Sequence, residues 1–156
     1  MHVQDCMKKR VFSISPTSPL SDAIKLFVSK HIGTLPVIDA NGKLIGLLLL
    51  RDIVGLVLPD FLKLISDIDF VHEFGAIEEH VPSHETLMQP VSNLMHPPVS
   101  VESDCGLVRA FSVLNKEGIL DLPVVDVQNV LVGIVSSIDI GTAYITNWNV
   151  TQGGIE

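Results

Sequence analysis

The chain contains the same pattern of hydrophobic and polar positions twice. In each half a short extended run is followed by an apolar stripe with helical spacing and then by two short apolar runs. Runs that are apolar throughout are typical of strands in a sheet covered on both faces. Each half then continues into a short helix that begins near an aspartate, so the predicted order is β-α-β-β-α. The stripes are Leu20, Ala23, Ile24, Phe27 and Val28, and Leu107, Ala110, Phe111 and Leu114.

One fixed offset of 87 residues relates the two halves. An internal duplication at a single spacing indicates the architecture more firmly than local propensity does. A unit of about sixty residues buries little surface when it is alone, so we expect the two copies to share one core. The residues that coincide are LPVID (35–39) with LPVVD (122–126), Gly46 with Gly133, and Asp52 with Asp139.

Turn and capping residues predict where the elements begin and end. Asn41-Gly42 is a strong two-residue hairpin signal, and Gln128-Asn129 is its weaker counterpart. Ser18 is the expected N-cap of the first long helix, with Pro19 at its first position. In the second copy Ser103 or Asp104 is the expected cap, and the two helices are expected to end at Gly33 and Gly118.

These signals divide the chain into a first unit (1–58), an inserted segment (59–90), a second unit (91–147) and a tail (148–156). The insert holds seven acidic residues against Lys63, a net charge of −6 out of −8 for the whole chain. A short arm, Val3 to Met7, is echoed by Val91 to Met95 at an offset one residue longer. We expect a short amphipathic helix at the start of the insert and a polar loop that runs through Glu85. The apolar positions of that helix are Phe61, Leu64, Ile65 and Ile68.

Composition excludes several classes of protein. Apolar residues make up 47% and aromatic residues 5% of the chain, which indicates an aliphatic core. An acidic chain whose only basic run is 8–10, interpreted as a solvated turn, argues against nucleic-acid binding. The longest strongly apolar run, 44–50, is too short to span a bilayer. Cys6 and Cys105 are isolated, so we expect reduced thiols in a cytoplasmic protein with no membrane association.

The histidines of the insert raise the question of a metal site. His80 and His84 have the spacing of ligands on one helix turn, with His72, Glu78 and Glu79 nearby. Pro82 lies between them and would break a helix, so a solvated acidic loop is the preferred interpretation and no metal is predicted. A metal- or pH-responsive insert is a weaker alternative. No nucleophile-base or phosphate-loop motif appears, so we expect no enzyme activity.

The end of the second unit carries the candidate binding chemistry. Ser136 and Asp139 place a hydroxyl and a carboxylate three residues apart where a strand leads into a helix. A carboxylate there can accept two hydrogen bonds from a vicinal diol such as a ribose. The N–H groups of the following helix favour an anion. The alternative is that Asp139 only caps its helix.

The duplicated LPV[IV]D and the two G-x-x-x-x-x-D ends resemble a cystathionine-β-synthase (CBS) domain pair, or Bateman module, over residues 1 to about 147 except for the insert. The resemblance implies an α/β (α+β) fold in which two βαββα units pack through their sheets with pseudo-twofold symmetry. It also implies that adenosyl ligands bind in the clefts between the units. In the second-repeat site Asp139 would hold the ribose, Ser136 would assist it, and the base would be lined by Val99, Val101, Leu120 and Asp121.

The first repeat departs from this pattern because Leu49 stands where the second has Ser136. A possible second site would comprise Asp52, Ile14 and Thr34, with Asp52 as a plain helix cap the alternative. Asp121 stands where a polyphosphate would favour a neutral or basic residue. We therefore expect a ligand with less negative charge than ATP, or one that carries a cation.

The resemblance implies a non-catalytic regulatory module that needs no cofactor and binds AMP, ADP, ATP, S-adenosylmethionine or NAD, mainly at the second-repeat site. Such modules commonly form homodimers through their helical faces, and a partner protein would sense the bound state. The alternative is a structural interaction module whose clefts are filled by side chains.

Overall fold

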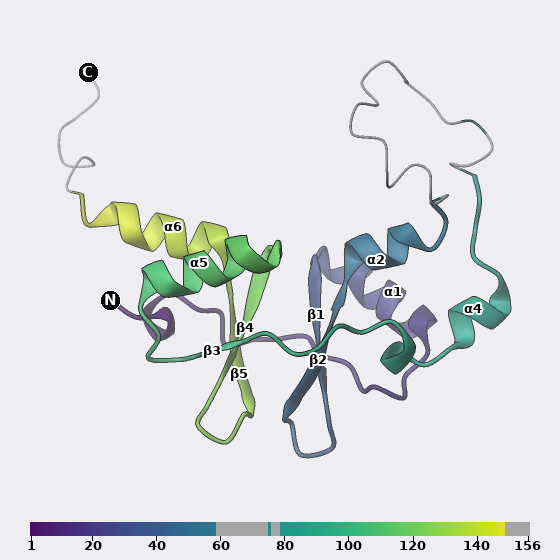
Figure 1. The fold of residues 1–156 in the computed structure, drawn as a ribbon, viewed down its shortest axis with the longest axis horizontal. Coiled ribbons are helices and arrows are strands. Elements are labelled where there is room, and N and C mark those ends of the chain that lie inside the picture. The colour runs from purple at the N-terminus through teal and green to yellow at the C-terminus, as the bar shows by residue number, and fades with distance from the viewer. Residues whose placement is uncertain (59–74, 76–78, 149–156) are drawn as a thin grey trace.

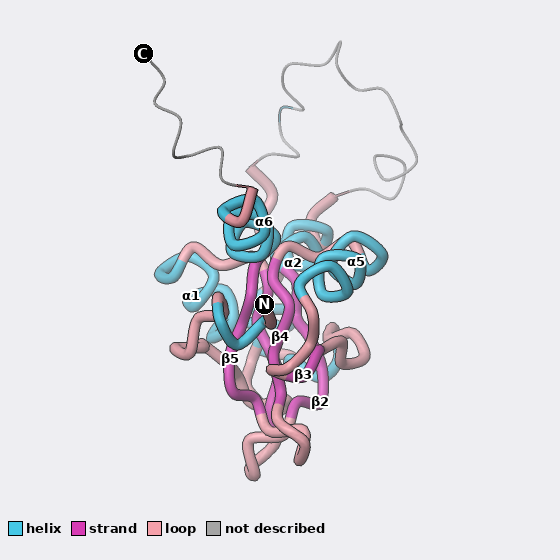
Figure 2. Tube along the Cα trace, turned by 90° about the vertical axis from the view of Figure 1, so that its left-hand side faces the viewer, coloured by secondary structure: helices cyan, strands magenta, loops and turns pink. Residues whose placement is uncertain are grey.

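Two small sheets form the centre of the computed structural model, which describes residues 1–58, 75 and 79–148 (Figure 1). The first sheet pairs β1 (Thr34–Ile38) with β2 (Leu44–Leu49), and the second has the order β3 (Val101–Glu102), β4 (Asp121–Val125) and β5 (Leu131–Ser136). In Figure 2 the helices lie mainly at the end of the molecule opposite the two hairpin turns. They are α1 (Leu20–Lys30), α2 (Leu50–Gly55), α4 (His84–Met88), α5 (Leu107–Glu117) and α6 (Ser137–Thr146), with 3₁₀ turns η1 (Val3–Asp5) and η3 (Val91–Asn93).

The two hairpins share one register, as the duplication predicts. Val37 lies opposite Gly46 in the first, and Val124 lies opposite Gly133 in the second. β3 runs parallel to β4, whereas its counterpart in the first half is a single parallel bridge between Ile14 and Val37. The predicted mixed α/β fold of two repeated units is confirmed, with the first strand of the first unit shortened to that bridge.

The aspartate of each LPV[IV]D motif shapes the hairpin turn that follows it. Oδ1 of Asp39 accepts hydrogen bonds from the N–H groups of Asn41 and Lys43, and Oδ1 of Asp126 does the same two and four residues further on. Both turns need a left-handed residue, which is Gly42 in the first (φ 78°) and Asn129 in the second (φ 64°). The turns join the halves, because the N–H of Leu44 donates to the Asn129 carbonyl at 3.1 Å.

The predicted helix caps are wrong in position. α1 begins at Leu20 with Pro19 as its N-cap, and the Leu20 N–H donates to the Gln89 carbonyl at 3.0 Å. A distant backbone segment therefore takes the role expected of Ser18. α5 begins after Gly106 rather than after the expected Ser103 or Asp104; the carbonyl of Ser103 instead accepts a hydrogen bond from the N–H of Gln4.

The helix ends differ between the copies. α5 ends at Gly118 in the left-handed conformation, as predicted, but α1 ends at His31 (φ 51°), two residues before Gly33. The apolar stripes are also narrower than predicted. Their i, i+3 and i+7 positions are buried, whereas Val28 is 69% exposed and Phe111 is 39% exposed.

Two short arms cross between the halves. The first arm, residues 1–8, packs on the second half: Val3 donates to the Cys105 carbonyl at 2.9 Å, and Lys8 and Ile134 exchange backbone hydrogen bonds. The second arm, residues 89–96, packs on the first half, where His96 and Leu47 exchange equivalent bonds at 2.7 and 3.1 Å. Each structural half is therefore completed by the arm that precedes the other half in sequence.

The repeated glycines allow the arms to approach. A Cβ at Gly46 would lie 2.9 Å from the His96 carbonyl oxygen and 2.7 Å from the Met95 sulfur. A Cβ at Gly133 would lie 3.1 Å from the Lys8 carbonyl oxygen and 2.6 Å from the Met7 sulfur. Both glycines are thus needed for the close contact of strand and arm.

The inserted segment is only partly described. The helix expected from 61 to 68 lies outside the described residues. The loop predicted through Glu85 is wrong at its end, because α4 begins at His84 and Ser83 caps it by accepting from the Thr86 N–H at 3.2 Å. Among the described helices, none combines the length and apolarity needed to cross a bilayer.

Candidate functional site

The cleft between the halves contains two cavities that share one wall residue, Thr34 at the start of β1. One cavity, of about 280 Å³, lies beside the first arm and the end of α1. The other, of about 420 Å³, lies between the start of α2 and the segment 118–120. We call them the basic cavity and the apolar cavity, after their linings described below.

The Ser136–Asp139 pair of the candidate motif is present as a capping box at the start of α6. The Ser136 Oγ accepts a hydrogen bond from the Asp139 N–H at 3.0 Å. In return, Oδ2 of Asp139 accepts from the Ser136 N–H at 3.0 Å and from its hydroxyl at 2.8 Å. Asp139 therefore does cap its helix, and its Oδ2 atom makes the capping hydrogen bonds. Oδ1 takes no hydrogen bond from the described part of the chain, and the side chain is 20% exposed.

A cation from the first arm stands next to this carboxylate. Lys8 Nζ lies 3.5 Å from Oδ2 of Asp139. Burial alone would raise the pKa of Asp139, but hydrogen bonds from Ser136 and the charge of Lys8 outweigh burial and lower that pKa. Asp139 is thus held in its ionised form, the form that accepts hydrogen bonds from a ligand hydroxyl.

The basic cavity adjoins this ion pair through Lys8. Its apolar wall comes from Phe12, Ile32 and Ile134. Three more basic side chains border it, and one carboxylate faces them from the start of β4. These residues are Lys8, Arg10, Lys30 and His31, with Asp121 opposite.

Asp121 is the carboxylate least well accommodated in the cleft. Burial raises its pKa, the nearby charge of Asp139 adds to that rise, and Lys8 and the Gly33 N–H oppose it less strongly.

We expect Asp121→Asn to raise the unfolding midpoint at pH 7, because an acid whose pKa is raised by folding destabilises the folded state once it ionises. The gain should vanish below about pH 3, where the carboxyl is protonated in both states. Thermal unfolding of the wild-type and variant proteins at the two pH values checks this. An equal gain at both would show that charge is not the cause.

The equivalent place in the first half holds a different pair of side chains. His96 Nε2, from the second arm, lies 2.6 Å from Oδ2 of Asp52. This pair corresponds to the longer contact, 3.5 Å, between Lys8 and Asp139 in the second half. Leu49, at the position of Ser136, is buried and offers no cap to α2. The apolar cavity next to it is lined mainly by aliphatic side chains. Arg51, which also lines this cavity, donates a hydrogen bond of 2.6 Å to the Gly118 carbonyl.

The structure distributes the predicted site residues over several places. Asp121 and Thr34 line the basic cavity, and Asp139 with Ser136 adjoins it through Lys8. Leu120 lines the apolar cavity, while Val101 is buried and borders a separate polar cavity. Val99 packs against the core of the second half, and Ile14 lies in the core of the first half.

Sequence reasoning missed the contribution of the first arm. The run 8–10 is exposed, as a solvated turn would be, but Lys8 also pairs with Asp139 and Arg10 lies over Phe12. The signal was present in the repetition of the arm at 91–95, which shows that the arm belongs to the duplicated unit.

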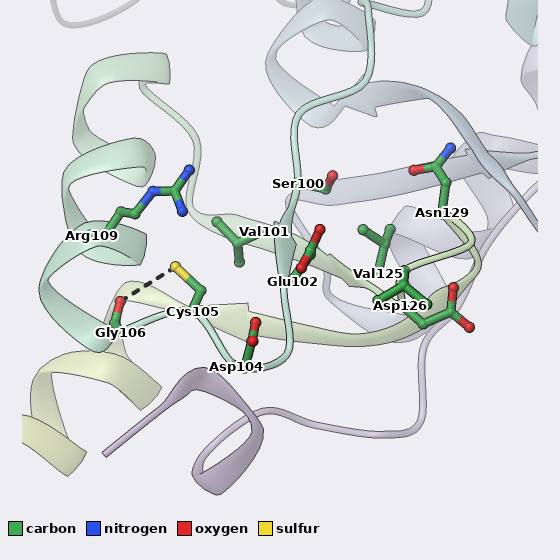
Figure 3. Close-up of a pocket in the computed structure, with 11 residues that line it drawn as sticks. Ser100, Val101, Glu102, Asp104, Cys105, Gly106, Arg109, Val125, Asp126 and Asn129 are labelled. Carbon is green, nitrogen blue, oxygen red and sulfur yellow. Dashed lines mark hydrogen bonds between the residues drawn. The ribbon is translucent and has the colours of Figure 1, made fainter.

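Another cavity, of about 650 Å³, is formed by the second half alone (Figure 3). Its charged lining is mostly acidic, from Glu102, Asp104 and Asp126 against Arg109. Among the described residues no cluster of three or more histidine, cysteine or acidic side chains could hold a metal ion. His72 and Glu78 of the weighed metal cluster lie outside the described residues.

Two βαββα units that exchange arms around a shared cleft define a tandem-repeat module. The sequence model of the family described as "CBS domain" matches residues 3–59 and 91–145, and the chain belongs to that family.

Relatives and solved structures agree with this assignment. An uncharacterized Methanocaldococcus jannaschii protein, MJ1426, is 31% identical over 93% of this chain and 92% of its own length. The crystal structure of CBSX2 in complex with AMP is 28% identical, covers 95% of this chain and 98% of that chain, and has a TM-score of 0.70. The CBS domain pair of MJ0100, solved with 5′-methylthioadenosine and S-adenosyl-L-methionine, has the same fold, with a TM-score of 0.69 and 20% identity over 94% of this chain and 98% of that chain.

Other relatives are longer than this chain. It spans 42% and 38% of two more uncharacterized M. jannaschii proteins, MJ0188 and MJ1232, which are 28% and 30% identical to it over 88% of its length.

Proposed function

We propose that this CBS pair is a non-catalytic regulatory module that binds one adenosyl ligand in the cleft, at the basic cavity beside Asp139. The observation that carries the proposal is the ionised Asp139, whose Oδ1 is unoccupied by any described residue and which adjoins a cavity between the halves. A ribose hydroxyl can donate to Oδ1 while Oδ2 keeps the capping box. The similarity to the AMP-bound CBSX2 structure supports the adenosyl class.

Binding there would act on the relative position of the halves. The cavity is lined by α1 and β1 of the first half on one side, and by β4, β5 and Lys8 of the first arm on the other. A ligand that contacts both sides favours the arrangement in which they lie closest, and a partner protein would sense that shift.

The alternative of a structural module without a ligand has support of its own. The capping box turns Oδ2 of Asp139 toward its own backbone, and in the first half Asp52 is paired with His96 while Leu49 replaces the hydroxyl of Ser136. The two functions differ in one measurable property, which is whether an adenosyl compound stabilises the folded chain.

A thermal-shift panel of AMP, ADP, ATP, S-adenosylmethionine and NAD tests the proposal. A ligand at a hundredfold excess over Kd adds about 2.7 kcal/mol to the free energy of unfolding. For a chain of this size we expect the midpoint to rise by about 5–10 °C with at least one of them. A flat response to all five, each at millimolar concentration, would favour the structural module.

A homodimer is part of the proposal. An apolar groove of about 360 Å³ lies between α5 and α6, and several of its large side chains are exposed. A second copy of the chain is proposed to cover this helical face. The exposed residues are Val108, Phe111, Tyr144, Ile145 and Trp148.

A further inference from the structure

The first arm and the residues that follow it cross the cleft between the halves (Figure 1). On the second half, Lys8 exchanges backbone hydrogen bonds with Ile134 at 2.8 and 2.9 Å. On the first half, the Ile14 N–H donates to a carbonyl of β1 at 3.0 Å. Lys8 lines the basic cavity, and so do Arg10 and Phe12 within the crossing. One wall of this cavity therefore depends on where the first arm lies.

Few side chains hold the first arm in place. Of its eight residues Val3 alone is buried, and Cys6 and Met7 are half-buried. The second arm has an additional attachment, since its Gln89 carbonyl accepts the first N–H of α1, and among the described residues the first arm makes no such bond to α5. Segments with few buried apolar contacts open locally at a low cost in free energy. The first arm is thus the part of the cavity wall that opens most readily.

The position of the first arm also decides which charges face Asp139. Lys8 Nζ, 3.5 Å away, is the only cation paired with this carboxylate in the part of the chain that the structure describes. Burial raises the pKa of the neighbouring Asp121, the charge of Lys8 opposes that rise, and the charge of Asp139 adds to it. Without the arm, two carboxylates would face each other across the cavity with no ammonium group between them. A docked arm therefore favours the ionised Asp139 that the proposed site needs.

We propose that the first arm is a regulatory element that is held on the second half when the basic cavity is occupied and is released more readily when it is empty. The inference rests on the proposed function and adds how the same site is regulated. A ligand that contacts the wall beside the arm favours the docked form, and by linkage the docked arm raises the affinity for the ligand. Release would uncover the backbone N–H and C=O of Ile134 on β5, the edge strand of its sheet.

Hydrogen–deuterium exchange of the full chain tests the coupling, without ligand and with each of AMP, ADP, ATP, S-adenosylmethionine and NAD. The amides of Val3, Gln4 and Ile134 donate across the contact between arm and second half, so in the free chain they should exchange faster than the amides of β4. With a bound compound at a hundredfold excess over its Kd, their exchange should slow about hundredfold, because the arm opens only in the ligand-free form. The equivalent amides of the second arm, Val91 and Ser92, should change little.

Val3→Ala loosens the arm without altering the cavity. Val3 is 0% exposed, lies at the other end of the arm from Lys8, and is not among the residues that line the cavity. We expect this variant to bind the adenosyl compound at least about fivefold more weakly, because the apparent affinity falls with the fraction of chains whose arm is docked. Calorimetric titration below the unfolding midpoint of the variant measures the affinity.

Val91→Ala is the matched control. Val91 is also 0% exposed, and its N–H donates to the Ser18 carbonyl at 2.8 Å, as the Val3 N–H does to the Cys105 carbonyl at 2.9 Å. It anchors the second arm, which contributes no residue to the basic cavity. This variant loses the same side-chain volume but should bind the compound within about twofold of the wild type, because the first arm stays docked.

The outcomes separate this inference from the proposed function. If a compound binds while the exchange of the first arm is unchanged, or if Val3→Ala binds it as tightly as the wild type, the coupling is wrong and the proposed function stands. A loss of affinity in Val91→Ala as large as that in Val3→Ala would show that general destabilisation is the cause, and the coupling would again be wrong. If none of the five compounds binds, the proposed function fails and this inference fails with it.

Discussion

Asp139→Ala is expected to abolish the ligand-dependent thermal shift and to lower the free energy of unfolding by about 1 kcal/mol. The two effects have different origins in the same side chain. The stability loss comes from Oδ2, which accepts hydrogen bonds from the N–H and hydroxyl of Ser136 in the capping box. The loss of binding comes from Oδ1 and from the negative charge, which together would hold the ribose. Thermal unfolding with and without ATP and AMP measures both effects.

Two comparisons separate these origins. Asp139→Asn retains an amide oxygen for the Ser136 N–H but removes the charge beside Lys8, so most of the stability should remain while ligand affinity falls. Asp52→Ala should leave nucleotide affinity nearly unchanged, because Asp52 is already engaged by His96 at 2.6 Å. If Asp52→Ala removes the nucleotide response and Asp139→Ala keeps it, the ligand lies on the other side of the cleft.

Gly46→Ala is expected to lower the free energy of unfolding by about 1–3 kcal/mol, the usual range for overpacking. The added methyl group would lie 2.9 Å from the His96 carbonyl oxygen, and that backbone is itself bonded to Leu47 on both sides of the contact. Relief therefore requires movement of the second arm. Gly133→Ala should have a smaller effect, because its nearest backbone atom is 3.1 Å away and the closer Met7 sulfur ends a flexible side chain. Denaturant unfolding gives both values.

Gly141→Ala is the control for the glycine substitutions. Gly141 lies inside α6, and an added Cβ would meet nothing within 4 Å. Removal of a helix-interior glycine should stabilise the chain by about 0.5–1 kcal/mol. A Gly46→Ala protein as stable as the wild type would show that the arm does not need the space that the glycine provides.

The elements that repeat in sequence were predictable because each pattern has a local physical cause. Both LPV[IV]D segments form buried strands that end in an aspartate-shaped turn, and both final helices carry the motif aspartate in their first turn. The positions of the caps were not predictable from local residues. The first N–H of α1 is bonded to Gln89, about seventy residues away in sequence, so a nearby serine was not needed.

The candidate site was predicted only in part, for a similar reason. Asp139 and Ser136 were found because their spacing is local, and both lie at the predicted strand-helix junction. Lys8 was not assigned to the cleft, since nothing in its local sequence shows that the first arm crosses to the second half. The backbone hydrogen bonds between Lys8 and Ile134 place it there.

The exchange of arms also bears on how such a chain can arise. In a single copy of the repeat, the arm would point away from its own hairpin, and the space beside the hairpin glycine would have no arm in it. Two identical copies could each place their arm beside the other's glycine, as residues 1–8 and 89–96 now do within one polypeptide. A single chain thus has the geometry of two repeat units that have exchanged their first arms and are joined end to end.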